Sequence, residues 1–152
     1  IMERLDGRGV RTVVDAEREL LTRVLPYRPF LVKPNNIELG DIYGVKLETR
    51  ADVIPYAKRM QQAGARNVLV SMAGEGGVLV AESGEVFDSP AAKGEVVNSV
   101  GAGDSSVAGF LAGLAETGSY ETAFRMALAA GSASAFSDHL ATRPEVEELM
   151  AR

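Results

Sequence analysis

The stretch Asn67-Val68-Leu69-Val70-Ser71-Met72 decides the fold class, because it is almost wholly apolar over the length of one strand. A continuous hydrophobic run of this kind is typical of a strand buried on both faces in the middle of a parallel sheet. Shorter strands are predicted over 10–15 and 30–32, and helices over 17–25 and 49–63. Strands that alternate with helices imply right-handed crossovers. The sequence therefore predicts an α/β fold, a partial Rossmann-like α/β/α layered arrangement around a mostly parallel sheet.

The flanking segments carry clear boundary signals. Asn36–Tyr43 is predicted to be a short helix that ends at Gly44, where a glycine favours termination. Two apolar stretches flank Glu82-Ser83-Gly84 and predict a β-hairpin. One more strand is expected at 95–97, and the rest of the chain is predicted to be helical, over 104–116, over 120–136 and from 143 onward.

Composition excludes several classes of function. The chain has 152 residues, 46% hydrophobic, with no cysteine, one histidine and a formal net charge of −5. The absence of cysteine excludes disulfides and thiolate metal sites, and a single histidine excludes multi-histidine metal sites. The negative charge argues against nucleic-acid binding, and no apolar run is long enough to span a membrane. We expect a protein of the cytoplasm that binds neither nucleic acid nor membrane.

Val100-Gly101-Ala102-Gly103-Asp104 is the most informative stretch for function. A predicted strand runs into two glycines, and a helix opens immediately after them. The first backbone N–H groups of a helix are unpaired and bind anions, above all phosphate. A carboxylate at Asp104 can take a proton from an alcohol that attacks a phosphoryl group. The alternative, a tight turn followed by an ordinary helix-start acid, stays open on this loop alone.

The two helices after this loop are rich in small residues, with glycines at 109, 113 and 131. Glycine inside a helix costs about 1 kcal/mol relative to alanine, so close approach by another group is indicated. Tight helix–helix packing and a flat adenine ring are both compatible with this pattern.

Four blocks, in this order, resemble the ribokinase-like, or phosphofructokinase B, carbohydrate kinases. The third is the glycine loop itself, which resembles the second signature of that family. The first block, Lys33-Pro34-Asn35-Asn36-Ile37-Glu38-Leu39, resembles the KPNxxEL block of the sugar-phosphate branch. The second, Val70-Ser71-Met72-Ala73-Gly74-Glu75-Gly76-Gly77, resembles the strand–SLGxxG loop that borders ATP. The fourth, Leu140-Ala141-Thr142-Arg143, resembles the C-terminal end of bacterial kinases that act on fructose 1-phosphate.

The resemblance implies a role for each matching residue. Asp104 is implied as the catalytic base, and the amides of Gly101, Ala102 and Gly103 as the hole for the transferred phosphoryl charge. Asn35 and Glu38 are implied to organise Mg²⁺ through water. The residues implied to bind ATP are Lys33, Ser71, Met72, Ala73, Gly74, Glu75, Gly76 and Gly103.

Structural alternatives stand beside these roles. Asn35 and Glu38 have the spacing of a helix-capping box, and Gly74 with Gly76 has the composition of a plain turn. Lys33 either approaches a phosphate or is a solvated charge at the end of a strand. Ala73 stands where relatives commonly have glycine, so a positive φ there would strain the loop.

The resemblance also implies an activity, the ATP-dependent phosphorylation of fructose 1-phosphate to fructose 1,6-bisphosphate. Tagatose 6-phosphate is the alternative substrate, and a nucleotide-binding fragment without catalysis is the alternative function. Residues 1–152 are expected to be the C-terminal ATP-binding and catalytic portion of one ribokinase-like domain, since the chain opens like the end of a helix. The N-terminal half, with the sugar site and lid, would then be absent, and the full-length protein could form a homodimer.

Overall fold

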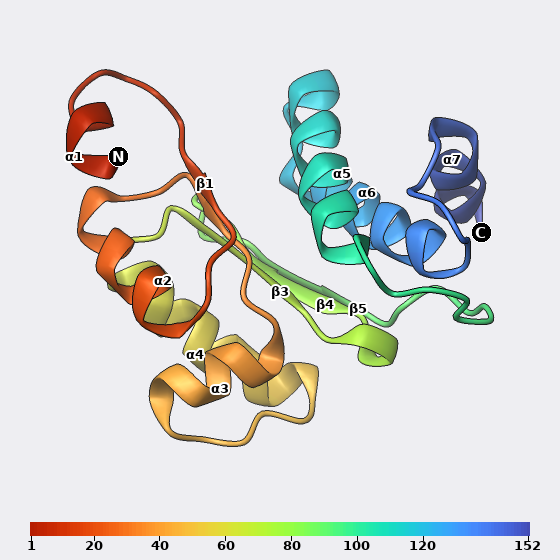
Figure 1. Ribbon diagram of the computed structural model, residues 1–152, viewed down its shortest axis with the longest axis horizontal. Coiled ribbons are helices and arrows are strands. Elements are labelled where there is room, and N and C mark those ends of the chain that lie inside the picture. Colours follow the sequence, from red (N-terminus) through yellow and green to blue (C-terminus); the bar gives the residue numbers. More distant parts are fainter. The chain divides into compact units, whose positions relative to one another are not determined.

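The computed structural model describes residues 1–152, which form two compact units, Ile1–Asp88 and Ser89–Arg152. The first unit alternates strands and helices along the chain (Figure 1). Its elements, with the last strand ending at the boundary, are α1 (Met2–Leu5), β1 (Val13–Val14), α2 (Arg18–Val24), the 3₁₀ turn η1 (Leu25–Tyr27), β2 (Leu31–Val32), α3 (Asn36–Tyr43), α4 (Arg50–Gln62), β3 (Asn67–Ser71), the 3₁₀ turn η2 (Ala73–Glu75), β4 (Gly77–Val80) and β5 (Val86–Ser89).

The five strands form one sheet in the order β1-β2-β3-β4-β5. β1 pairs with β2 and β2 with β3 in parallel, whereas β3 pairs with β4 antiparallel. The prediction of an α/β fold is confirmed, but the sheet is mixed. Only the short turn η2 joins β3 to β4, and a parallel pairing needs a crossover of about a dozen residues or more.

Helices α2, α3 and α4 cover one face of this sheet (Figure 1). The strand residues that face them alternate with Leu31, Leu69 and Leu79, which lie on the opposite face. The core between helices and sheet consists mainly of buried aliphatic side chains, among them Leu21, Leu39, Val53, Ala57, Met60, Val32, Val68, Val70, Val78 and Val80. This packing fixes the strand ends from which the predicted site residues emerge.

The second unit is helical after its first dozen residues. It contains α5 (Ala102–Thr117), α6 (Tyr120–Ala135) and α7 (Arg143–Ala151), which confirms the predicted helices. A side chain at Gly109 would meet the Met126 carbonyl oxygen at 2.4 Å, and one at Gly131 would meet Ser106 Oγ at 2.3 Å. These glycines therefore allow α5 and α6 to pack closely, and tight packing accounts for the small residues.

The strand expected at 95–97 is wrong. Val96 and Val97 are 64% and 60% exposed, and no strand is present there. The amides of Val97 and Asn98 instead both donate to the carbonyl oxygen of Ala135, at 2.8 and 3.1 Å. Carbonyls in the last turn of a helix lack intrahelical partners, and this one at the end of α6 anchors the segment. The glycine loop is therefore entered from an irregular segment rather than from a strand.

No helix of the protein combines the length and the apolar character that crossing a membrane requires.

Candidate functional site

The first group of predicted site residues lies at the carboxyl ends of β2 and β3. Asn35 and Ser71 are partners in an isolated parallel bridge, and the Ser71 amide donates to the Pro34 carbonyl at 3.2 Å. Ligands of open α/β sheets bind outside the carboxyl ends of the strands. The structure thus brings together two blocks that are separated by more than thirty residues in the sequence.

Asn35 and Glu38 form a complete capping box at the start of α3. The Asn35 side chain accepts from the Glu38 amide and the Glu38 carboxylate accepts from the Asn35 amide, both at 2.8 Å. The box uses only Oε2 of Glu38, so Oε1 remains for another contact. Oε1 of Glu38, with the second lone pair of the Asn35 amide oxygen that already accepts from the Glu38 amide, fits a Mg²⁺ ion held mainly by water and phosphate. The structure contains no cluster of three or more acidic, histidine or cysteine side chains that could enclose a metal ion.

Lys33 follows β2 and is not a solvated charge. Its side chain is only 8% exposed, and Nζ pairs with Oδ2 of Asp15 at 3.4 Å. Sequence reasoning missed this partner. The available signal was the position of both residues directly after parallel strands, but only the observed register of β1 and β2 sets them side by side.

The loop after β3 is closed by its own backbone. The Met72 amide donates to the Gly76 carbonyl at 2.8 Å, and the Glu75 amide donates to the Met72 carbonyl at 3.0 Å. The Met72 side chain lies in the core, whereas residues 73–75 are exposed. Ala73 has φ +46°, so the expectation of strain at this position is confirmed. A ligand would therefore meet the backbone of residues 73–75 and not the Met72 side chain.

Arg50, the first residue of α4, holds this loop from outside. Its Nη1 donates to the Glu75 carbonyl at 2.7 Å and its Nε donates to Oδ2 of Asp88 at 3.0 Å. Nothing in the local sequence around Arg50 indicated this contact, because its partners are 25 and 38 residues away.

The second group of predicted residues lies at the start of α5, in the second unit. Gly101 is the N-cap, with φ +80°, and no side chain caps the helix. The Ala102 amide donates to the Ser99 carbonyl at 3.2 Å, whereas the amides of Gly103 and Asp104 have no acceptor. The Asp104 side chain is exposed and forms no ion pair. Free amides beside a free carboxylate are suited to binding an anion and accepting a proton.

A buried pair of serines supports this helix start. Ser134 Oγ donates to Ser105 Oγ at 2.6 Å and accepts from the Ala141 amide at 2.8 Å. A side chain at Gly101 would meet Leu140 Cδ2 at 2.5 Å, so the segment at 140–143 lies directly behind the glycine loop. Sequence reasoning missed both serines, whose spacing of 29 residues gives no local signal.

Thr142 begins the capping box of α7 in the same segment, and His139 bonds to it. The ring nitrogens of His139 lie 3.0 Å from Oδ1 of Asp138 and 3.1 Å from Oε1 of Glu145. The hydrogen bond with Asp138, followed by that with Glu145, raises the pKa of His139 above its usual value. The sequence indicates no role in the chemistry for this histidine, and in the structure it contacts Glu145 of the α7 capping box.

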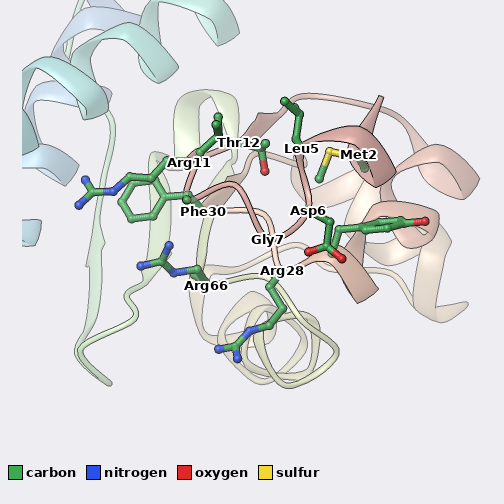
Figure 2. A pocket seen from close by; sticks show the side chains of 12 residues that line it. Met2, Leu5, Asp6, Gly7, Arg11, Thr12, Arg28, Phe30 and Arg66 are labelled. Atoms are coloured by element: carbon green, nitrogen blue, oxygen red, sulfur yellow. The ribbon is translucent and has the colours of Figure 1, made fainter.

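A separate hollow of about 70 Å³ lies near the amino ends of β1, β2 and β3 (Figure 2). The guanidinium groups of Arg11 and Arg66 both lie over the Phe30 ring, 4.9 and 5.0 Å from its centroid. Arg66 also donates to both carboxylate oxygens of Glu82. None of the predicted site residues lines this hollow.

The fold and the two groups of residues define a class of protein. The chain belongs to the pfkB family of carbohydrate kinases, whose sequence pattern matches residues 7–145.

Particular relatives narrow the class further. The chain is 42% identical over 150 residues to 1-phosphofructokinase of Bacillus subtilis, covering 99% of the chain and 49% of that protein. It is 32% identical over 72 residues to D-tagatose-1-phosphate kinase of Klebsiella oxytoca, covering 47% of the chain and 24% of that protein. The chain spans about half the length of the curated relatives that it matches over most of its residues.

Solved structures agree with this assignment. A Staphylococcus aureus protein with a provisional phosphofructokinase assignment superposes with a TM-score of 0.92 at 40% identity, covering 99% of the chain and 49% of that protein. Ribokinase of Arabidopsis thaliana superposes with a TM-score of 0.80 at 23% identity, and the match covers 99% of this chain and 51% of the ribokinase chain. This similarity shows that the fold is ribokinase-like.

Proposed function

We propose that residues 1–152 are the C-terminal, ATP-binding and catalytic portion of a sugar-phosphate kinase. The proposed reaction transfers the γ-phosphoryl group of ATP to fructose 1-phosphate and yields fructose 1,6-bisphosphate and ADP. The similarity to 1-phosphofructokinase of Bacillus subtilis supports the substrate. The observation that carries the proposal is the start of α5, where unpaired amides stand beside the exposed carboxylate of Asp104.

Asp104 acts as the general base in this proposal. Its carboxylate accepts the proton of the acceptor hydroxyl while that oxygen forms a bond to the γ-phosphorus. The bond from the γ-phosphorus to the bridging oxygen breaks, and its electron pair leaves with ADP. The amides of Gly101 and Gly103 stabilise the charge on the transferred group. The Ala102 amide joins them only if it leaves the Ser99 carbonyl.

The residues of the first unit bind the nucleotide. Lys33 and the loop at 71–76, through the exposed backbone of residues 73–75, contact the phosphates and ribose of ATP. Glu38 and Asn35 hold Mg²⁺ through water, and the ion neutralises phosphate charge when bound. We place the reaction in the cytoplasm, where ATP and sugar phosphates are supplied, and the homodimer stays a prediction for the full-length protein.

Substitution of the base tests the proposal. In the protein expressed from its complete reading frame, Asp104→Asn should lower kcat for fructose 1-phosphate by about 10³-fold. The dissociation constant for Mg-ATP should stay within about twofold, because the amide side chain leaves the helix start intact. Asp138→Asn removes another exposed carboxylate of the same unit and serves as the control, with unchanged kcat. Equal kcat in Asp104→Asn and wild type would reject the role of Asp104.

Tagatose phosphates are the alternative substrates within the same class. The quoted motifs are shared with tagatose 6-phosphate kinases, and a D-tagatose-1-phosphate kinase is among the relatives. The values of kcat/KM for fructose 1-phosphate, fructose 6-phosphate and both tagatose phosphates, measured on the protein from its complete reading frame, identify the substrate. A preference for a tagatose phosphate would replace the proposed one.

A nucleotide-binding role without catalysis is the second candidate function, and the coverage of only 49% of the Bacillus subtilis relative favours it for the 152-residue chain. The chain should be incubated with Mg-ATP and fructose 1-phosphate while ADP release is followed. Sustained turnover would eliminate this candidate, and Mg-ATP binding without turnover would support it.

A further inference from the structure

Lys33 has an unusual environment for a lysine. Its side chain is 8% exposed, and the ammonium group carries three N–H donors, yet the carboxylate of Asp15 is its only protein partner. A buried charge needs compensation by a partner, and one carboxylate at 3.4 Å uses at most one of these donors. The Lys33 ammonium therefore keeps donors for a further acceptor.

The pair follows from the register of the sheet. Val13 is paired with Leu31 and Val14 with Val32 in the parallel ladder of β1 and β2. The Lys33 amide donates to the Val14 carbonyl at 3.3 Å, so the ladder continues to the next pair of residues. Asp15 therefore stands beside Lys33 at the carboxyl edge of the sheet, where ligands of α/β proteins bind.

Asp15 and Lys33 differ in side-chain exposure, and this difference indicates that Asp15 orients Lys33 rather than the reverse. The Asp15 side chain is 42% exposed and has no second partner, whereas that of Lys33 is enclosed. The lysine ammonium is carried on a flexible four-carbon side chain. The Asp15 carboxylate, as the partner of that ammonium, therefore restricts the orientation of the Lys33 side chain. The neighbouring exposed pair of Arg18 and Asp41, with side chains 72% and 44% exposed, has no enclosed member.

We propose that Asp15 is a positioning residue for the nucleotide: it holds the Lys33 ammonium at the carboxyl edge of β2, where that ammonium receives phosphate oxygens of ATP. This inference rests on the proposed function, because it requires that ATP binds at this edge.

The test compares ATP with adenosine, which lacks phosphates, by calorimetric titration of the protein expressed from its complete reading frame. Asp15→Asn should weaken Mg-ATP binding by about tenfold and leave adenosine binding unchanged. Asp15→Glu, which keeps the charge but displaces it by one methylene, should weaken Mg-ATP binding at least threefold. Lys33→Met should weaken Mg-ATP binding at least as much as Asp15→Asn does. The double variant should bind Mg-ATP no more weakly than Lys33→Met alone. Asp41→Asn is the control with the same change of charge and unchanged binding.

Each outcome separates the inference from the proposed function. Wild-type Mg-ATP affinity in both Asp15 variants overturns the inference, as does an equal loss for ATP and adenosine. If Asp15→Asn does not fold, Asp15→Glu alone decides by the same criteria. Failure of the wild-type protein to bind Mg-ATP would instead reject the proposed function itself.

Discussion

The two glycine-rich loops of this protein resemble each other in sequence and differ in whether their backbone amides are free to bind a ligand. In the loop at 72–76, the amides of Met72, Glu75 and Gly76 already donate to carbonyls of the same loop. In the loop at 99–104, the amides of Gly103 and Asp104 have no acceptor. The first loop is a closed turn with an exposed surface, and the second is an open helix start.

This difference shows why glycine content alone does not define an anion site. A turn satisfies its own donors, whereas the first turn of a helix cannot, because its acceptors would lie before the helix begins. The closed loop can border a ligand through its shape, and the open loop can bind charge. If this difference matters for function, changes in the open loop should lower kcat, and changes in the closed loop should affect the KM for ATP or the stability.

Gly101→Ala should have the largest effect. The new methyl group would contact Leu140 Cδ2, and alanine disfavours the left-handed backbone at φ +80°. The start of α5 should therefore shift. We expect kcat to fall about 100-fold and the free energy of unfolding to fall by about 1–2 kcal/mol. Gly118→Ala, at the other end of α5 with φ +67° and open space around it, is the matched control. It should lose similar stability at unchanged kcat; equal kcat losses would mean that the loop at 99–104 has no special role.

Arg50→Ala should affect the closed loop and not the open one. Loss of the bond to the Glu75 carbonyl should lower the free energy of unfolding by about 1 kcal/mol and raise the KM for ATP severalfold, with kcat nearly unchanged. Lys46→Ala, which removes an exposed pair with Glu48, should change the free energy of unfolding by less than about 0.5 kcal/mol. A fall in kcat without a rise in KM would contradict the division between the loops.

Ala73→Gly should stabilise the closed loop. Relief of the left-handed backbone at φ +46° should outweigh the added freedom of the unfolded chain and raise the free energy of unfolding by about 0.5–1 kcal/mol. Ala51→Gly in the first turn of α4 should have the opposite sign, since a helix disfavours glycine. Denaturant unfolding of both variants measures this, and a loss of stability in Ala73→Gly would show that its strain is compensated elsewhere.

The smallest effect concerns the segment behind the open loop. The pKa of His139 is raised in the folded chain, so the folded state binds the proton more tightly. This stabilisation is complete below the usual value of about 6.5 and is lost as the pH rises through the folded pKa. The Tm difference between wild type and His139→Gln should therefore be larger at pH 5.5 than at pH 8.5. A constant difference would contradict the contribution of the Asp138 and Glu145 contacts.

Features set by neighbouring residues were predictable from the sequence. The helix at 36–43 has the bounds that its capping residues and Gly44 indicated, and α5, α6 and α7 begin within two residues of their expected starts. These elements depend on hydrogen bonds between residues three or four positions apart, which the sequence displays directly.

Features that depend on distant partners were not predictable. The valines at 96 and 97 have the composition of a strand but no strand to pair with. The same applies to the candidate site. The family resemblance supplied Lys33, Asn35 and Asp104, whereas the contacts of Lys33 with Asp15 and of Ser105 with Ser134 required the three-dimensional arrangement.

The shared anchor at the end of α6 has a consequence for the timing of loop motion. Because the amides of Val97 and Asn98 donate to the same Ala135 oxygen, a movement that displaces this oxygen breaks both hydrogen bonds. Their amide protons should exchange with deuterated solvent at correlated rates, governed by that opening, although the Val97 side chain is already in contact with water.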